Sequence, residues 1–400
     1  MISVETARDI VLAALRPTAG ETVSLDRAMG RILAQDLAAR VSHPPVAVSA
    51  MDGYAARAAD LAVCPAQLTI IGQSAAGAPF AGTVGPGEAV RIFTGAALPA
   101  GADCVVMQEN TQRDGAMVTM REGVAAGKFV RAPGLDFSTG DVLLRAGSVL
   151  GGRAVGLAAA MNIPSLAVRR RPRIAILSTG DEIVMPGEPM APAQIVGSNG
   201  PGLAAFVTAL GGEPVHLGIA RDTRASLDAM IAAAAGCDLL VTTGGASVGD
   251  YDLVQDALAA SGLKLGFYTI AMRPGKPMMF GDLGGIPVLG LPGNPVSAMV
   301  GAVVFLEPAI RALVGLATAT IPLTASLGRD LPANDARQDY LRASLERTDT
   351  GTVIATPFTQ QDSAVLSGLV RADALAIRPP HAPAAAKGDP IQVIVLPEQW

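Results

Sequence analysis

The chain has 400 residues, 50% of them hydrophobic and 16% charged, which predicts a globular protein of two to four domains. Its formal charge is -5, from 35 acidic and 30 basic residues without a Lys/Arg block, and this argues against a nucleic-acid partner. Cys64, Cys104 and Cys237 lie far apart without CxxC or Cys/His spacing, which argues against zinc or a disulfide framework and favours a reducing cytoplasm.

The N-terminal segment predicts helices rather than an export signal. Residues 3–15 form an amphipathic pattern that begins at Ser3 as N-cap and carries charged residues within it. Residues 25–37, LDRAMGRILAQDL, also have apolar residues at helical spacing. Two very apolar runs, 149–168 and 296–306, contain polar residues or fall short of the roughly 20 residues that a membrane span requires. We therefore expect buried core helices and no membrane partner.

In the rest of the chain the pattern of apolar runs and turn residues changes three times, which predicts a multidomain protein with α/β and β parts. Short β-rich runs separated by Gly/Pro turns predict a small β domain, and a basic joint at 169–173 precedes alternating strands and helices. This alternation is typical of a doubly wound, mostly parallel α/β sheet. The predicted domains are an N-terminal helical and linker part at 1–48 with 137–168, the small β domain at 49–136, the α/β domain at 169–316, and a C-terminal β-barrel at 317–400.

The predicted elements of the last two domains follow in chain order. We expect strands of the α/β sheet at 174–178, 214–220, 237–243, 263–271 and 286–291. Helices are expected between them at 202–212, 224–236, 252–262 and 297–315. The C-terminal strands are expected at 323–327, 339–345, 351–358, 374–380 and 390–397.

Acidic residues follow three of the predicted parallel strands. Glu182 ends IAILSTGDE, Asp222 lies in the ARDT turn, and Asp252 ends LLVTTGGASVGDYD. The carboxyl ends of such strands form a ligand crevice. Carboxylates repel a phosphate unless a hard cation lies between them, and Mg²⁺ is held by one or two carboxylates plus phosphate oxygens. Charge balance thus predicts a magnesium site, while the alternative is that each acid caps the following helix.

Three glycine- and proline-rich turns predict an anion site at the same edge. TTGGAS at 242–247 offers backbone N–H groups to a phosphate, although it also suits a ligand-free tight turn. RPGKP at 273–277 brings Arg273 and Lys276 to a stiff loop that suits an oxyanion, or is a solvated basic loop. LPGNPVS places Asn294 and Ser297 at the start of an apolar helix, where an N-cap would explain Asn294 equally well.

Several common catalytic fingerprints do not occur. GKP at 275–277 has proline where a P-loop needs its hydroxyl, and STGDEI at 178–183 lacks the glycine spacing of a dinucleotide site. The sequence has no nucleophile elbow, and His43, His216 and His381 have no acidic partner at useful spacing. P-loop, nicotinamide or flavin, and triad chemistry are disfavoured.

Six strings in this order resemble the molybdopterin molybdenumtransferases, the MoeA family that includes the E domain of gephyrin. They are SAMDGYA (49–55), IFTGAALPAGADCVVMQE (92–109), STGDE, GGASVGDYD, PGKP and LPGNPVS, and the resemblance covers essentially the whole chain. Three of these motifs also occur in the single-domain molybdopterin adenylyltransferases, whose MogA-like molybdopterin-binding fold the α/β domain is similar to. The two N-terminal strings are more restrictive.

The resemblance implies insertion of molybdate into adenylylated molybdopterin, with magnesium-dependent hydrolysis and release of AMP. It implies a cytoplasmic homodimer whose active site joins Glu182, Asp222 and Asp252, the metal-handling acids, with three catalytic residues from the partner subunit's β domain. Those three match Asp52, Thr94 and Asp136. The implied molybdate site is formed by Arg273, Lys276, Ser297, Arg337 and Ser363. The other implied substrate contacts are Ser178, Thr179, Gly180, Gly244, Gly245, Ser247, Pro292 and Asn294. A transient contact with a molybdopterin adenylyltransferase would deliver the substrate.

Departures from the family pattern include two positions near the predicted site, and three alternative functions remain open. Gly197 stands where relatives usually carry aspartate before a Ser-Asn pair, and Arg273 stands where lysine is common. The alternatives are a molybdopterin adenylyltransferase, a nucleotide pyrophosphatase that uses the same α/β domain, and a non-catalytic scaffold. Neither of the first two needs the N-terminal portion that contains Asp52 and Thr94.

Overall fold

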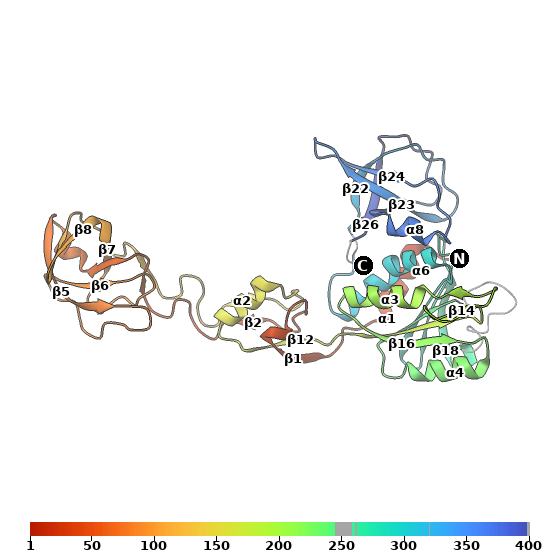
Figure 1. Cartoon of the computed structure of the whole chain (residues 1–400), viewed down its shortest axis with the longest axis horizontal. Helices are drawn as coiled ribbons and strands as arrows, with labels where there is room; N and C mark the ends of the chain where they lie inside the picture. Colours follow the sequence, from red (N-terminus) through yellow and green to blue (C-terminus); the bar gives the residue numbers. More distant parts are fainter. Residues whose placement is uncertain (245–257, 261, 320, 398–400) are drawn as a thin grey trace. The chain divides into compact units, whose positions relative to one another are not determined.

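The chain folds into two compact units, Met1–Glu21 with Arg169–Trp400, and Thr22–Val168. The computed structural model describes residues 1–244, 258–260, 262–319 and 321–397 (Figure 1). The predicted helix at 252–262 falls largely outside these residues.

A six-stranded sheet forms the centre of the first unit. Its order is β16-β13-β17-β21-β20-β18. The parallel strands are β13 (Arg173–Thr179), β16 (Glu213–Ala220), β17 (Leu239–Thr243) and β21 (Ile286–Leu291). The antiparallel edge consists of β18 (Leu263–Thr269) and β20 (Pro277–Leu283). The predicted mostly parallel sheet is confirmed, and β20 is an additional strand. A small ribbon, β14 (Ile183–Val184) with β15 (Ile195–Val196), follows β13.

Helices cover both faces of this sheet. One face buries α1 (Val4–Ala14), α3 (Asn199–Ala209), α6 (Pro295–Gly301) and α7 (Glu307–Leu313), and the other buries α4 (Arg224–Ala233) (Figure 1). Helix α1 begins as predicted, because Ser3 Oγ accepts a hydrogen bond of 3.0 Å from the Thr6 N–H. Its apolar residues pack into the α/β core. The first 21 residues therefore belong to the α/β unit, which differs from the predicted N-terminal domain at 1–48.

The most apolar helix crosses the core. Within the described residues, Pro295–Leu313 is long and apolar enough to span a membrane, but 78% of its apolar window is buried inside the protein. Between α6 and α7 it widens into a π-helical segment, Ala302–Leu306. Pro308 has no N–H for the α-helical bond to residue 304, which explains the local change of spacing.

The C-terminal domain is a closed barrel, as predicted. Its strands are β22 (Leu323–Leu327), β23 (Gln338–Arg347), β24 (Val353–Pro357), β25 (Ala374–Arg378) and β26 (Pro390–Val395). The pairing of β23 with β25 closes it. The short β19 (Met272–Arg273) pairs with β23, and α8 (Leu366–Val370) follows β24. Tyr340, Leu375 and Ile394 share the core of the α/β domain, so the two domains pack directly on each other.

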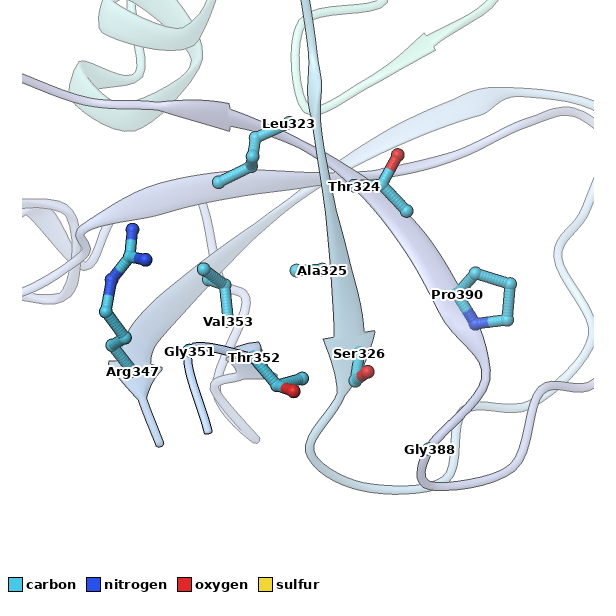
Figure 2. A pocket seen from close by; sticks show the side chains of 10 residues that line it. All are labelled: Leu323, Thr324, Ala325, Ser326, Arg347, Gly351, Thr352, Val353, Gly388 and Pro390. Atoms are coloured by element: carbon cyan, nitrogen blue, oxygen red, sulfur yellow. The ribbon is translucent and has the colours of Figure 1, made fainter. Parts of the chain in front are cut away.

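The barrel has an open hollow of about 420 Å³ where β22 and β24 diverge (Figure 2). These strands pair only at Ser326 and Leu327 of β22, so Leu323–Ala325 have no strand partner in β24. Arg347 is the one charged residue in the lining, among aliphatic, hydroxyl and glycine residues. This hollow lacks the carboxylates and paired cations expected of the predicted site.

The second unit contains the predicted small β domain and a connecting part. The β domain has the order β7-β4-β6-β5-β9-β8. Its strands are β4 (Gly53–Ala56), β5 (Ala66–Ser74), β6 (Glu88–Ile92), β7 (Cys104–Met107), β8 (Thr111–Asp114) and β9 (Met117–Met120), with β3 (Val48–Ser49) paired to β10 (Val130–Arg131). The connecting elements are β1 (Gly20–Ser24), β2 (Leu37–Ala38), β11 (Val142–Leu144), α2 (Gly152–Ala160) and β12 (Ser165–Arg169). Short 3₁₀ turns occur at η1 (Leu25–Arg27), η2 (Ala58–Leu61) and η3 (Gln108–Asn110).

The helix predicted at 25–37 is wrong. Only the 3₁₀ turn Leu25–Arg27 forms, and Gly30 at φ +73° breaks the helical path. Ile32 and Leu33 instead make β-bridges to Val149 and Val168. The helical spacing of Ala28, Leu33 and Leu37 reflects separate contacts with one small core.

Candidate functional site

The ends of four parallel strands meet at one edge of the central sheet. The strand register pairs Thr179 with Ala220, Ser178 with Thr243, and Thr243 with Leu291. The turns that follow β16, β13, β17 and β21 therefore begin side by side. The predicted alignment of the strand ends at one edge of the sheet is confirmed.

Glycine is required at the end of β17, where the chain touches the end of β13. Gly244 has φ +88°, and a Cβ there would lie 2.6 Å from the Thr179 carbonyl oxygen. A Cβ on Gly293 would lie 3.5 Å from the Gly244 Cα. The Gly293 contact is an ordinary one, but the approach of Gly244 to Thr179 leaves no room for a side chain, so the chain meets there through its backbone. Pro292 is buried beside Gly293, whereas Gly245 and Ser247 lie outside the described residues.

Asn199 at the start of α3 adds a polar side chain that sequence reasoning did not place in the site. Its Nδ2 donates to the Gly293 carbonyl oxygen at 2.8 Å. Its Oδ1 is buried and accepts no hydrogen bond from the described residues. The Ser198–Asn199 pair, just before the predicted helix at 202–212, was the sequence signal that could have identified Asn199. A Cβ on Gly197 would lie 2.7 Å from Ile183 Cγ2, so a side chain at this position would have to displace Ile183.

Two of the three predicted metal-handling acids lie on neighbouring strand ends. Glu182 follows β13 and Asp222 follows β16, and both are exposed. The Asp222 N–H donates to Asp181 Oδ1 at 3.2 Å, which links the two turns. The third acid, Asp252, lies outside the described residues. Among the residues described, no group of three metal-binding side chains converges.

The capping alternative does not hold for Asp222. Thr223 is the N-cap of α4, and its hydroxyl accepts from the Ser226 N–H. The Asp222 carboxylate is therefore not used as a helix cap. Mg²⁺ takes one or two carboxylates and completes its shell with water and phosphate oxygens. The carboxylate oxygens of Glu182 and Asp222 fit Mg²⁺ when a phosphorylated ligand and water supply its other oxygen ligands.

Two residues predicted to bind molybdate, Ser297 and Ser363, lie at the start of α6, where the barrel packs against it. Ser297 is only 4% exposed. Asn294 is the N-cap residue, but its side chain makes no cap bond and its Nδ2 donates to Ser363 Oγ at 3.1 Å. The Val296 N–H donates to the Ser363 carbonyl oxygen at 3.2 Å. A Cβ on Gly275 would lie 3.8 Å from the Ser297 carbonyl oxygen, so the RPGKP turn also reaches α6, and Lys276 in that turn is exposed.

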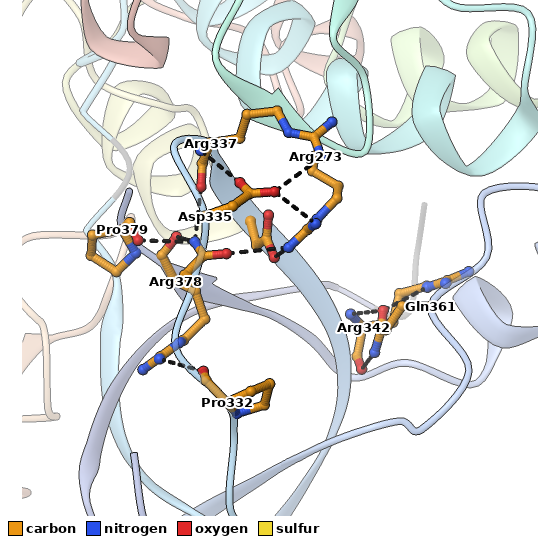
Figure 3. A network of polar contacts seen from close by, with 10 residues as sticks. Arg273, Pro332, Asp335, Arg337, Arg342, Gln361, Arg378 and Pro379 are labelled. Carbon is orange, nitrogen blue, oxygen red and sulfur yellow. Dashed lines mark hydrogen bonds and ion pairs between the residues drawn. The ribbon is translucent and has the colours of Figure 1, made fainter. Parts of the chain in front are cut away.

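The two arginines predicted for this site are held in an ion-pair network (Figure 3). Arg273 pairs with Asp339 and, at 3.1 Å, with Asp335. Arg337 pairs with the same Asp335 at 3.2 Å. The hydrogen bond that Arg273 donates to the Asp339 carboxylate is the main reason that the pKa of Arg273 is raised. Both guanidinium groups thus already have carboxylate partners, which sequence reasoning did not foresee.

The β domain brings together two of its three predicted catalytic residues. Asp52 Oδ1 accepts hydrogen bonds of 2.7 Å from both the backbone N–H and the hydroxyl of Thr94. These bonds lower the pKa of Asp52, so its carboxylate stays ionised at neutral pH. Arg91 donates to the Gly53 carbonyl oxygen and lies over the ring of Tyr54.

The third of these residues, Asp136, is exposed and lines a hollow of about 570 Å³ within the same unit. Gly95, next to Thr94, and Arg131 also line it.

Family comparisons match three consecutive regions of the chain. Residues 2–162 match the MoeA N-terminal region (domain I and II), residues 175–312 match a probable molybdopterin binding domain, and residues 324–396 match the MoeA C-terminal region (domain IV). The chain belongs to the MoeA family. The family resemblance stated from the sequence motifs is thereby confirmed.

Individual relatives agree with this assignment. A molybdopterin molybdenumtransferase from Nostoc sp. is 38% identical over 387 residues, which cover 94% of this chain and 89% of the relative. One from Bacillus subtilis is 32% identical over 392 residues, or 95% and 91% of the two chains. A crystal structure of a molybdopterin biosynthesis MoeA protein from Pyrococcus horikoshii superposes with a TM-score of 0.88 at 31% identity and covers 99% of both chains.

MoeA membership accounts for the domain order but assigns no individual side chain. The N-terminal match includes the segment that carries Asp52 and Thr94, which a single-domain adenylyltransferase would not need. The roles of the predicted site residues remain predictions.

Proposed function

We propose that this chain is a molybdopterin molybdenumtransferase that acts on adenylylated molybdopterin, releases AMP and inserts molybdenum from molybdate. The family match over three consecutive regions supports the overall reaction. The observation that carries the finer proposal is the alignment of four parallel strand ends with exposed acids on two of them. Such an edge is where open α/β sheets bind their ligands.

The nucleotide and pyrophosphate would lie across these strand ends. Backbone groups around Gly244 and Gly293 would approach the phosphates closely, as glycine turns allow. Glu182 and Asp222, with Asp252, would hold a magnesium ion that, when bound, offsets the charge of the pyrophosphate. The buried Oδ1 of Asn199 offers an acceptor to a donor on the ligand.

Molybdate would bind beside the start of α6. It is a dianion, and Arg273, Arg337 and Lys276 supply the positive charge, while Ser297 and Ser363 supply hydroxyl groups. Planar guanidinium groups suit oxyanions because they donate two parallel hydrogen bonds. The packing of the barrel on α6 supports this assignment, since it holds Ser363 against Asn294.

We further propose a cytoplasmic homodimer in which Asp52, Thr94 and Asp136 of one subunit complete the site of the other. Their presence in a compact unit separate from the α/β domain supports the idea that they reach a second chain. The ionised Asp52 would orient a cation or a water molecule rather than take up a proton, because its pKa is lowered.

The proposal is tested with purified protein, adenylylated molybdopterin, molybdate and Mg²⁺. AMP release, together with cofactor that activates an apo-molybdoenzyme, is the expected result. Asp222→Asn should reduce both, whereas Asp228→Asn, on the exposed face of α4 where Asp228 pairs with Arg224, should not. Adenylylation of free molybdopterin by ATP would instead support an adenylyltransferase. Binding of the substrate without turnover would support a scaffold.

A further inference from the structure

One exposed carboxylate joins the two arginines of the proposed molybdate site. Asp335 Oδ2 lies 3.1 Å from Arg273 Nη1 and 3.2 Å from Arg337 Nη2. Its Oδ1 accepts the Arg337 backbone N–H at 2.9 Å. Figure 3 shows Asp335 between the two guanidinium groups. A bridging carboxylate of this kind occupies donors that an oxyanion would need.

A second carboxylate on Arg273 has a different character. Asp339 lies opposite Arg273 in the β19–β23 register and bonds to its Nη2. Its side chain is only 6% exposed, whereas that of Asp335 is 48% exposed. Exposed ion pairs contribute little because water and salt screen them, while a buried pair is costly to break. The ion pair between Asp339 and Arg273 is therefore expected to persist, whereas another anion can readily replace Asp335 on the two arginines.

The charge of Asp335 persists over the working range of pH. Hydrogen bonds from the backbone and side chain of Arg337 lower the pKa of this carboxyl, and the charge of Arg273 adds to the effect. Arg273, Arg337, Asp339 and Asp335 together carry no net charge, since two cations face two anions. An arriving dianion would meet two arginines whose charges are already balanced, unless one carboxylate leaves.

We propose that Asp335 is an internal competitor of the oxyanion: it occupies Arg273 and Arg337 in the substrate-free chain and leaves them when molybdate binds. Asp339 remains in place and keeps Arg273 directed at the site. The inference rests on the proposed molybdate site. Its consequence is selectivity, because a monoanion gains less than a dianion from replacing a carboxylate that is itself a monoanion.

Molybdate binding to the full chain tests this competition by equilibrium dialysis at constant ionic strength. Asp335→Asn removes the competing charge, so the molybdate Kd should fall about three- to tenfold, the scale of one to two exposed ion pairs. The half-saturating molybdate concentration in turnover should fall by the same factor with kcat unchanged. Asp335→Ala provides a second variant with the same expectation.

Two controls separate competition from general charge effects. Asp349→Asn removes one negative charge from the exposed turn between β23 and β24 and should leave the Kd within about twofold, since screening weakens distant charges. Asp339→Asn should weaken binding, because Arg273 loses its fixed partner.

The outcomes distinguish this inference from the proposed function. If wild-type protein binds molybdate and releases AMP but Asp335→Asn binds molybdate no more tightly, Asp335 is not a competitor and the inference is overturned. Weaker binding by Asp335→Asn would overturn it as well, because Asp335 would then be positioning the arginines. If wild-type protein neither binds molybdate nor releases AMP, the proposed function fails and the inference falls with it.

Discussion

Replacement of Gly244 by alanine tests whether the strand ends must touch for the site to work. Gly244 follows β17 at φ +88°, and the added Cβ would lie 2.6 Å from the Thr179 carbonyl oxygen and 2.9 Å from its hydroxyl oxygen. Both atoms belong to the end of β13, so the two strand ends must separate to admit one methyl group. The perturbation acts at the floor of the proposed phosphate site and changes no charge.

The expected cost has two parts. A non-glycine residue in the left-handed region costs about 1–2 kcal/mol, and overpacking against a neighbour costs about 1–3 kcal/mol more. Gly218 in β16 is a matched control, because it has φ +87° but no atom within 4 Å of its added Cβ. Gly218→Ala should show only the backbone part. The difference between the two variants therefore isolates the contact between β13 and β17.

Urea unfolding and AMP release measure the two consequences. Gly244→Ala should lose about 2–5 kcal/mol of unfolding free energy, the sum of both costs, and most of its turnover. Gly218→Ala should lose about 1–2 kcal/mol and keep its turnover at temperatures where it is folded. Equal losses of stability and activity in both variants would refute the idea that close approach of these turns forms the site.

Three further predictions concern other parts of the site. Arg342→Met should cost about 1–3 kcal/mol in urea unfolding, because Gln361 Oε1 and two backbone carbonyl oxygens of the loop that carries Ser363 lose their hydrogen-bond donor; an unchanged unfolding free energy would contradict the idea that Arg342 holds this loop. Thr94→Val removes one of the two hydrogen bonds that lower the pKa of Asp52, so this pKa should rise, which carboxyl NMR would show. The acid limb of the pH–activity profile should then move to higher pH. Mixing Asp52→Ala with Glu182→Ala should restore part of the turnover through heterodimers that regain one intact site, and no recovery would argue against shared sites.

Much of the first unit could be predicted because its signals are local. Continuous apolar runs ending in glycine turns identified the parallel strands, since strands buried on both faces need such runs. Ser3 identified the start of α1 for the same reason, as an N-cap acts within one turn of helix. The barrel strands followed from short β-rich runs between turn residues.

One missed element had a local signal, and the others depend on partners far away in the chain. β20 pairs with β21 across the two-residue turn Gly284–Gly285, and such a Gly-Gly turn is typical of a β-hairpin. β4 lies within the SAMDGYA motif, where a Cβ on Gly53 would lie 1.9 Å from the Val106 carbonyl oxygen; the glycine is needed for the approach of β7. The pairing of Arg273 with Asp335 joins residues that no short pattern relates.

The most direct test of the central claim is a crystal structure with AMP, Mg²⁺ and molybdate, with anomalous data collected at the molybdenum edge. The account predicts the phosphate of AMP over the Thr179, Gly244 and Gly293 turns, with the metal ion between Glu182 and Asp222. It also predicts a molybdenum peak beside Arg273 and Ser297. AMP bound away from the four strand ends, with Glu182 and Asp222 facing solvent, would contradict it.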